Sequence, residues 1–204
     1  MHTPQHRNRL LPIVRNVALY GCALALGVGS ALWVLKKVPA LTAGVRIGAW
    51  QTDVRAGSTS AGLYTRALIA VHALLALDRN ETMYFVANHD DAGKPLRSTC
   101  SYRVEGVPPN ARWWSVTAYT DDMYLFDDVP GGAYSLNSKT ATLDPQGHFV
   151  LTTGGQRQPG IPWLPTPGDR GLVLTLRVFN PEPALQAAPQ SLQPPSIAAV
   201  GACA

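Results

Sequence analysis

The chain has 204 residues, of which 46% are hydrophobic, and its formal net charge is +4. The charge is unevenly divided: residues 1–46 hold six basic residues and no acid, whereas residues 47–204 hold 11 basic and 13 acidic residues. A nucleic-acid surface needs an excess of positive charge on the folded domain itself. The composition therefore argues against a nucleic-acid partner.

An apolar segment without a charge begins at Val17 and ends at Leu35. A helix of this length, at about 1.5 Å per residue, is long enough to span most of the hydrocarbon core of a bilayer. Trp33 and the pair Lys36–Lys37 close it, as is typical of a membrane interface. We predict an uncleaved transmembrane anchor over 17–35. The alternatives are a buried core helix and a cleaved signal peptide, but a signal peptide needs a shorter apolar region and a small-residue cleavage site.

The orientation of the anchor depends on its flanking charges. Three arginines precede the segment, and Lys36, Lys37 and Arg46 follow it, so the count of positive charges is balanced. Because a tail with three arginines and two histidines is costly to translocate, we predict that residues 1–16 form a cytoplasmic basic tail. The expected partner of the anchor is the lipid bilayer. The location predicted is the bacterial inner membrane, single-pass, with the C-terminal domain in the periplasm.

Behind the anchor, residues rich in Gly, Ala, Ser and Thr predict a linker over 36–60 and a folded domain over 61–204. A helix is predicted over 62–77, and its broad apolar surface favours packing on a sheet. Alternation of apolar and polar residues then predicts strands. They are expected at 82–88, 96–106, 112–119, 133–138, 140–143, 148–153 and 172–179. The proline-rich residues 181–195 are expected to sustain neither helix nor ladder pairing and to wrap the surface.

These short strands favour a mainly β fold, an antiparallel β-sandwich with one packed helix, preceded by the transmembrane helix. Residues 112–119 (RWWSVTAY) are the densest strand pattern in the chain. Adjacent tryptophans place a large ring on each face of that strand. We therefore expect Trp113 and Trp114 both to be buried, in a strand in the middle of a sheet.

Two cysteines, Cys100 and Cys203, lie in the predicted domain, and Cys22 lies in the membrane segment. In an oxidising compartment a domain with two cysteines favours a disulfide between them. The alternative is two unrelated thiols. A Cys100–Cys203 bridge would tie the proline-rich tail to the sheet.

Residues that could carry chemistry form no recognisable motif. The paired aspartates lack calcium-loop spacing, the histidines lack ligand spacing, and no G-x-S-x-G motif occurs, so we predict no metal, cofactor or catalytic residue. Stacking rings and carboxylates suit a sugar or other polar ligand. The best candidate ligand-binding residues are therefore Tyr119, Asp121, Tyr124 and Trp163. Alternatively, Trp163 plugs the core beneath its own loop.

Arg177 interrupts the apolar pattern of the strand predicted over 172–179. A buried charge is costly unless it is paired. We expect either an acidic partner, such as Asp121 or Asp122, or a position that faces solvent.

A series of short motifs carries a family resemblance. Their order is Tyr84-Phe85, DDAGKPL (90–96), Pro108-Pro109, WWSVTAY (113–119), WLPTP (163–167), LRVFNP (176–181) and PPSI (194–197). This order over residues 48–200 resembles the bacterial domain of unknown function 1214, which is often found behind domain of unknown function 1254. The chain departs from the family pattern at two positions. Pro162 stands where Asn often does, and Trp113 stands where many members have Phe. The resemblance implies a jelly-roll-like sandwich, here in a short anchored form without the 1254 domain, and it implies no reaction.

The sequence thus favours a membrane-anchored cell-envelope protein that is a binding or structural module. The alternative is an envelope hydrolase-like enzyme that acts on a sugar or other polar ligand through a pocket near Trp163. A site that joins two carboxylates, or a base beside a hydroxyl, would favour the enzyme.

Overall fold

The computed structural model describes residues 10–37, 44–53, 55, 57–58, 61–71, 77–154, 157–201 and 203. The chain divides into two compact units, residues 1–42 and 43–204. The first contains α1 (Leu10–Lys37), a single helix of 28 residues. Its part Pro12–Val34 is, by length and composition, apolar enough to cross a membrane, and none of it is buried. The predicted long apolar helix is confirmed, and it contains all of the segment 17–35.

The second unit is a β-sandwich of two sheets. The larger sheet has six strands in the order β1 (Val45–Ile47), β2 (Trp50–Thr52), β3 (Thr82–Ala87), β9 (Leu172–Pro181), β5 (Ala111–Thr120) and β6 (Ser135–Asn137). The smaller sheet has four strands in the order β10 (Ser196–Ala199), β4 (Tyr102–Gly106), β7 (Phe149–Thr153) and β8 (Trp163–Leu164). All pairs are antiparallel except β7 with β8, which is parallel. The mainly β, two-sheet architecture is confirmed.

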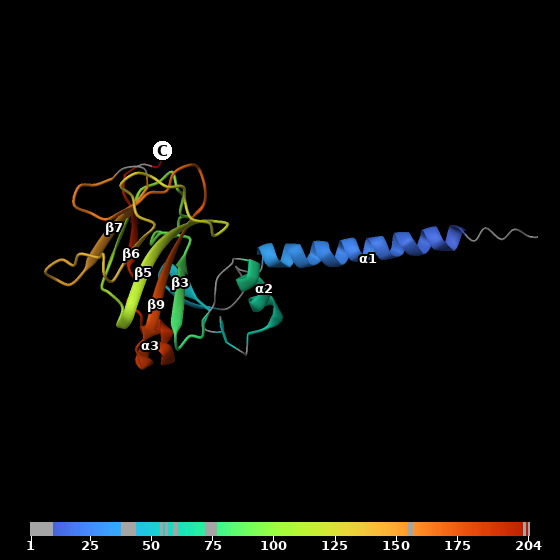
Figure 1. Ribbon diagram of the computed structural model, residues 1–204, viewed down its shortest axis with the longest axis horizontal. Helices are drawn as coiled ribbons and strands as arrows, with labels where there is room; N and C mark the ends of the chain where they lie inside the picture. Colours follow the sequence, from blue (N-terminus) through green and yellow to red (C-terminus); the bar gives the residue numbers. More distant parts are fainter. Residues whose placement is uncertain are drawn as a thin grey trace, which may run out of the picture. The chain divides into compact units, whose positions relative to one another are not determined.

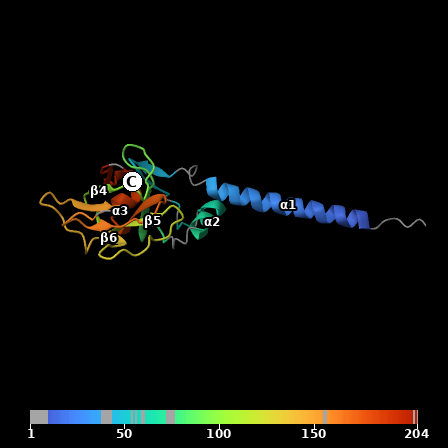
Figure 2. The same ribbon diagram turned by 90° about the horizontal axis from the view of Figure 1, so that it is seen from above.

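The long strands β5 and β9 organise the larger sheet. They pair over their full length, from Ala111↔Pro181 to Thr120↔Leu172, and β3 lies on the other side of β9 (Figure 1). Seen from above, β4 of the smaller sheet lies on the opposite side of the sandwich from β5 and β6 (Figure 2). As predicted, the WWSVTAY strand has a neighbour on each side.

The core lies between the two sheets. Apolar side chains at every second position of β5 and β9 are buried, among them Trp114, Val116, Leu176 and Val178. They meet buried residues of the smaller sheet: Tyr102, Val104, Phe149, Leu151, Leu164 and Ile197. The alternation is the reason, since successive side chains of a strand point to opposite faces.

The predicted linker over 36–60 is wrong for residues 45–52, because these form β1 and β2 at the edge of the larger sheet. Trp50 is completely buried, and its Nε1 donates a hydrogen bond of 2.7 Å to the Pro195 carbonyl. Strands of three residues are too short for their alternation to stand out in the sequence. The folded domain therefore begins before residue 61.

The predicted helix over 62–77 corresponds to α2 (Leu63–Val71), and residues 72–76 lie outside the described part of the chain. No described side chain of α2 is buried, and Leu63 is 84% exposed. The expected packing of this helix on the sheet is therefore not seen among the described residues.

The prediction that residues 181–195 sustain no helix is also wrong. This segment forms α3 (Pro183–Ala187) and the 3₁₀ turn η2 (Pro189–Ser191), and Figure 1 shows α3 at the end of the sandwich away from the C-terminus. Each begins with a proline, a position where the missing N–H costs no helical hydrogen bond. Buried Leu185 and Leu192 hold the segment to the core.

Candidate functional site

The four predicted ligand-binding residues fall in two places. Tyr119 lies near the end of β5 and is half-buried, while Asp121 and Tyr124 lie in the following turn and are exposed. Trp163 belongs to β8 of the other sheet, and its Nε1 donates to the Gly154 carbonyl at 2.8 Å. The first three are neighbours in the chain, whereas the indole of Trp163 closes its own loop.

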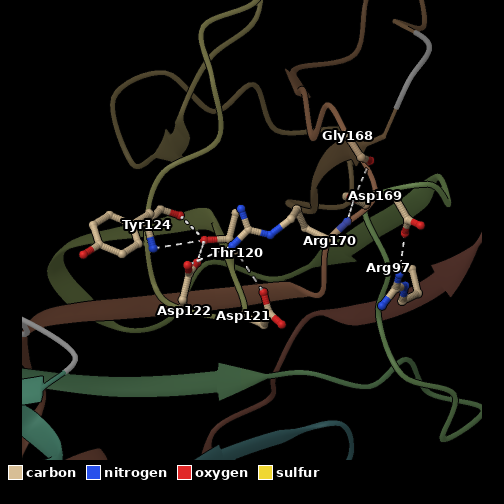
Figure 3. Close-up of polar contacts among 9 residues, drawn as sticks. Arg97, Thr120, Asp121, Asp122, Tyr124, Gly168, Asp169 and Arg170 are labelled. Carbon is tan, nitrogen blue, oxygen red and sulfur yellow. Dashed lines mark hydrogen bonds and ion pairs between the residues drawn. The ribbon is translucent and has the colours of Figure 1, made fainter.

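The turn after β5 is a hydrogen-bonded cluster (Figure 3). The Thr120 hydroxyl donates a hydrogen bond to the Asp122 carboxylate and accepts one from the Tyr124 N–H at 3.1 Å. Arg170 binds the other oxygen of Asp122 at 2.8 Å and lies 3.8 Å from Asp121. The ring of Tyr124 points away from the cluster and is 72% exposed.

Thr120 and Asp122 place a carboxylate beside a hydroxyl, the pairing that a nucleophile and its base would show. The hydrogen bond from Thr120, with the Arg170 guanidinium beside it, lowers the pKa of Asp122 below its usual range. A general base works best with a pKa near the operating pH, and this shift goes the opposite way. The arrangement is therefore that of a stabilised turn.

The same end of the sandwich holds the loop before β9. Ser98 is buried, donates to the Gly168 carbonyl at 2.7 Å and accepts from the Arg170 N–H at 2.8 Å. Arg97 pairs with Asp169 on the surface (Figure 3). Exposed ion pairs contribute little to stability, so the buried serine is the stronger link. These contacts fix the loop and supply no free reactive group.

A second cluster lies on the outer face of the larger sheet, away from the smaller sheet. Arg177 of β9 donates from Nη2 to the Tyr119 hydroxyl at 2.6 Å and from Nη1 to the Thr117 hydroxyl at 3.2 Å. Its guanidinium carbon lies 5.2 Å from the centre of the Tyr119 ring. Neither Asp121 nor Asp122 pairs with it, so the first of the two expectations, an acidic partner, is wrong. The second expectation is closer, because the side chain lies on the outward face of the sheet and is partly exposed.

Aromatic rings continue this face. Trp113 meets Phe179 edge-on, with 5.0 Å between ring centres and 69° between ring planes. Both residues are half-exposed, so the prediction that Trp113 is buried is wrong. We refer to Trp113, Tyr119, Arg177 and Phe179 as the outer aromatic face. Between these large side chains lies a floor of small, buried hydroxyl residues, Ser115, Thr117 and Thr175.

A groove of about 320 Å³ lies at the end of the sandwich near α3. Its walls come from the β4–β5 connection, with Pro108 and Pro109, and from the segment after β9, with Leu185 and Leu192. Glu182 is the charged residue among its lining. The groove is mainly apolar and holds no pair of catalytic groups.

Glu105, Asp144 and His148 bring their ligand atoms within 4.8 Å of one another. Arg103 pairs with Glu105 at 2.8 Å, and one Asp144 oxygen accepts the backbone N–H groups of Gln146 and His148. A guanidinium beside one ligand and backbone bonds on another oppose cation binding. We therefore assign no metal to this trio.

The sulfur atoms of Cys100 and Cys203 form a disulfide, which joins the chain before β4 to the C-terminus. Cys100 is buried in the core, 4% exposed. Cys22 in α1 is a free, exposed thiol. The bridge thus links the core to the last residues of the chain.

Comparison with known proteins identifies the family to which the chain belongs. The family described as protein of unknown function DUF1214 matches residues 81–183, half of the chain. The chain belongs to the DUF1214 family. The matched region of this DUF1214 chain runs from just before β3 to the start of α3, so it includes both β5 and β9. No curated protein matches it.

Two solved structures resemble this DUF1214 chain. A protein from Vibrio parahaemolyticus is 21% identical with a TM-score of 0.56, and the match covers 68% of this chain and 35% of that one. An uncharacterized protein from Burkholderia cenocepacia is 15% identical with a TM-score of 0.45, and covers 66% and 33%. The chain thus spans about a third of the length of either. The Vibrio match supports the fold alone.

Proposed function

We propose that this DUF1214 chain is a membrane-anchored binding module of the bacterial cell envelope. The observation that carries the binding role is the outer aromatic face, whose rings are only partly buried on the two longest strands of the sheet. Apolar clusters that stay partly accessible and are rimmed by polar groups are typical of interaction sites. Aromatic side chains are suited to this because they supply contact area with little loss of rotamer freedom.

The geometry favours binding over catalysis. β5 and β9 are paired along their whole length, so the face they carry is a rigid platform. The hydroxyl–carboxylate pair of Thr120 and Asp122 serves the turn, because Thr120 also bonds the backbone of Tyr124 and Asp122 is paired with Arg170. Trp163, on which the hydrolase alternative depends, is bound to Gly154 and lies outside the lining of the groove.

The anchoring role is supported by α1, whose charge-free part 17–35 can span a bilayer. The location of the domain is supported by the disulfide, because disulfides persist in oxidising compartments such as the periplasm. We infer a single-pass protein of the inner membrane with its sandwich in the periplasm.

The binding role is tested by capturing the full-length protein, in parallel with its Trp113→Ala variant, from native membranes and identifying what accompanies each by mass spectrometry. Tyr134→Ala is the matched control, since Tyr134 is an exposed ring outside the outer aromatic face. We expect a species retained by the parent and by Tyr134→Ala and lost from Trp113→Ala. An identical set for all three would overturn the proposal.

The anchoring is tested on isolated membranes, and the location of the domain is tested by alkylating its cysteines in gently opened cells. We expect the chain to resist alkaline extraction from membranes, and both domain cysteines to escape alkylation until a reductant is added. Release by alkali would contradict the anchor. Immediate alkylation of Cys100 and Cys203 in gently opened cells would contradict the periplasmic location.

A further inference from the structure

We propose that Arg177, with the hydroxyls of Thr117 and Tyr119, binds an oxyanion, a carboxylate or phosphate group. The same ligand would lay an apolar part on Trp113 and Phe179. This inference rests on the proposed function, because it names the chemistry that the outer aromatic face would recognise.

The first argument is a cation without a counter-charge. Arg177 is half-buried, and none of the described carboxylates lies within ion-pair distance of it. Two of its N–H groups are engaged, by Thr117 and Tyr119, and a guanidinium has further donors to offer. A partly desolvated charge is costly unless it is paired, so an anionic ligand would find a favourable partner here.

The second argument is the direction of the hydrogen bonds. A guanidinium only donates, so the Thr117 and Tyr119 oxygens accept from Arg177 and keep their own protons. The cluster therefore offers two hydroxyl donors beside the remaining N–H groups of a cation. A carboxylate or phosphate oxygen only accepts, and charge-assisted hydrogen bonds of this kind are the stronger ones. A cationic ligand would meet repulsion at the same place.

A third hydroxyl points to the same chemistry. Thr175 lies opposite Thr117 in the β5–β9 register and is 1% exposed. Its Oγ1 makes no hydrogen bond with any described group. Buried hydroxyls normally have a partner. Thr82 and Thr153 are the other described hydroxyls in this state, and Thr175 differs from them in lying on the same face of β9 as Arg177.

The site is held in place before any ligand arrives. Arg177 lies opposite Ser115 in the register, and its side chain reaches along the sheet to Tyr119, four residues further on β5. There the guanidinium also contacts the Tyr119 ring. Groups fixed by a sheet and by each other lose little entropy on binding.

The aromatic pair sets the shape of the ligand. Trp113 and Phe179 are opposite each other, two residues from Ser115 and Arg177 on the same face. The guanidinium contacts Thr117, which is four residues from Trp113 on the same face and so about 13 Å away along the strand. A ligand that contacts both places therefore carries its oxyanion at one end of an apolar part about that long, such as an acyl chain.

The test uses the full-length protein in phosphatidylcholine nanodiscs and phenylacetate as the probe, followed by saturation-transfer NMR. Phenylacetamide, of the same shape without the charge, is the matched probe. We expect phenylacetate to bind, phenylacetamide to bind at least about tenfold more weakly, and inorganic phosphate to compete. Equal binding of the two probes would overturn the oxyanion site.

Variants of the protein show where phenylacetate binds. Arg177→Gln is expected to weaken phenylacetate binding about tenfold or more, and Tyr119→Phe by several-fold, because each removes a donor. The matched control is Arg170→Gln, an exposed arginine paired with Asp122. Should Arg177→Gln fail to fold, Arg177→Lys keeps the charge without the fork and is expected to bind more weakly than the parent. Unchanged phenylacetate binding by an Arg177 variant that folds would overturn the proposal.

The source of the oxyanion is distinguished by a last arm, in which phosphatidylglycerol replaces phosphatidylcholine. Loss of phenylacetate binding in those discs indicates a lipid headgroup as the ligand, and unchanged binding indicates a soluble one. The two proposals fail separately. If Trp113→Ala loses its captured species but Arg177→Gln retains it, the face binds a neutral ligand and the oxyanion site alone is wrong.

Discussion

Trp113 and Trp114 are adjacent in the chain and lie in opposite environments. Trp114 faces the smaller sheet, is 3% exposed and stacks on Phe149 with 4.6 Å between ring centres. Trp113 faces outward, is half-exposed and meets Phe179 edge-on. The inner face of β5 is covered by a second sheet, whereas the outer face carries a cation and hydroxyl groups. The difference indicates that the inner face maintains the fold, and it leaves the outer face for the binding role that we propose.

The largest expected effect is on the inner side of this comparison. Trp114→Ala should lower the free energy of unfolding by about 3–5 kcal/mol, because it leaves a cavity against Phe149. Chemical unfolding of the detergent-solubilised protein, followed by circular dichroism, measures it. A loss no larger than that of Trp113→Ala would break the distinction between the two faces.

The disulfide adds a covalent link to the inner layer, since Cys100 belongs to the core. Cys203→Ala should cost about 2–4 kcal/mol, as expected for a bridge that closes a long loop. The same unfolding experiment under non-reducing conditions tests it. Cys22→Ala, which removes a free thiol in α1, is the control and should leave the domain unchanged. Equal stability of the two variants would show that the bridge is dispensable.

On the outer side, Trp113→Ala should cost only about 1–2 kcal/mol, because the ring is half-exposed and its main aromatic partner is Phe179. Its effect on ligand capture should be far larger than its effect on unfolding. Trp113→Phe keeps a ring and should restore part of the capture. A variant that is strongly destabilised and still captures its ligand would reverse the roles assigned to the two tryptophans.

The smallest effect concerns the turn at the end of the outer face. The hydrogen bond from Thr120 and the nearby Arg170 hold the pKa of Asp122 below its usual range, so its contribution to stability is present at neutral pH. That contribution should fade as the pH falls below about 4 and passes through the lowered pKa. Since Asp122 is exposed, the change is small. Asp122→Asn should remove it, and a steeper acid profile in the variant would contradict this account.

Much of the fold could be predicted from local pattern. The strands expected at 82–88, 112–119 and 172–179 match β3, β5 and β9, and the family resemblance is confirmed. The strand expected over 96–106 begins only at Tyr102, although Leu96, Ser98 and Cys100, which alternate along the segment before it, are buried. Alternation predicts burial even where the ladder is absent, because a bent chain can still turn every second side chain inward.

The candidate site was less accessible to prediction. The sequence predicts Tyr119 as a candidate, but for its neighbour in space, Arg177, it predicts either an acidic partner such as Asp121 or Asp122 or a position that faces solvent. Those two carboxylates lie beside Arg170 instead. Which cation meets which acid depends on strand register and loop path, and neither can be read from the spacing of charges in the chain.

Residue order along the chain is enough to predict the long apolar helix, the alternation that makes β5 and β9 strands, and membership of the family, because each depends on neighbouring residues or on motif order. Contacts between distant segments are needed to establish that β1 and β2 extend the sheet and that Trp114, not Trp113, is buried. The same kind of contact places Arg177 against Tyr119. An alternating strand has two equivalent faces until distant segments of the chain cover one of them.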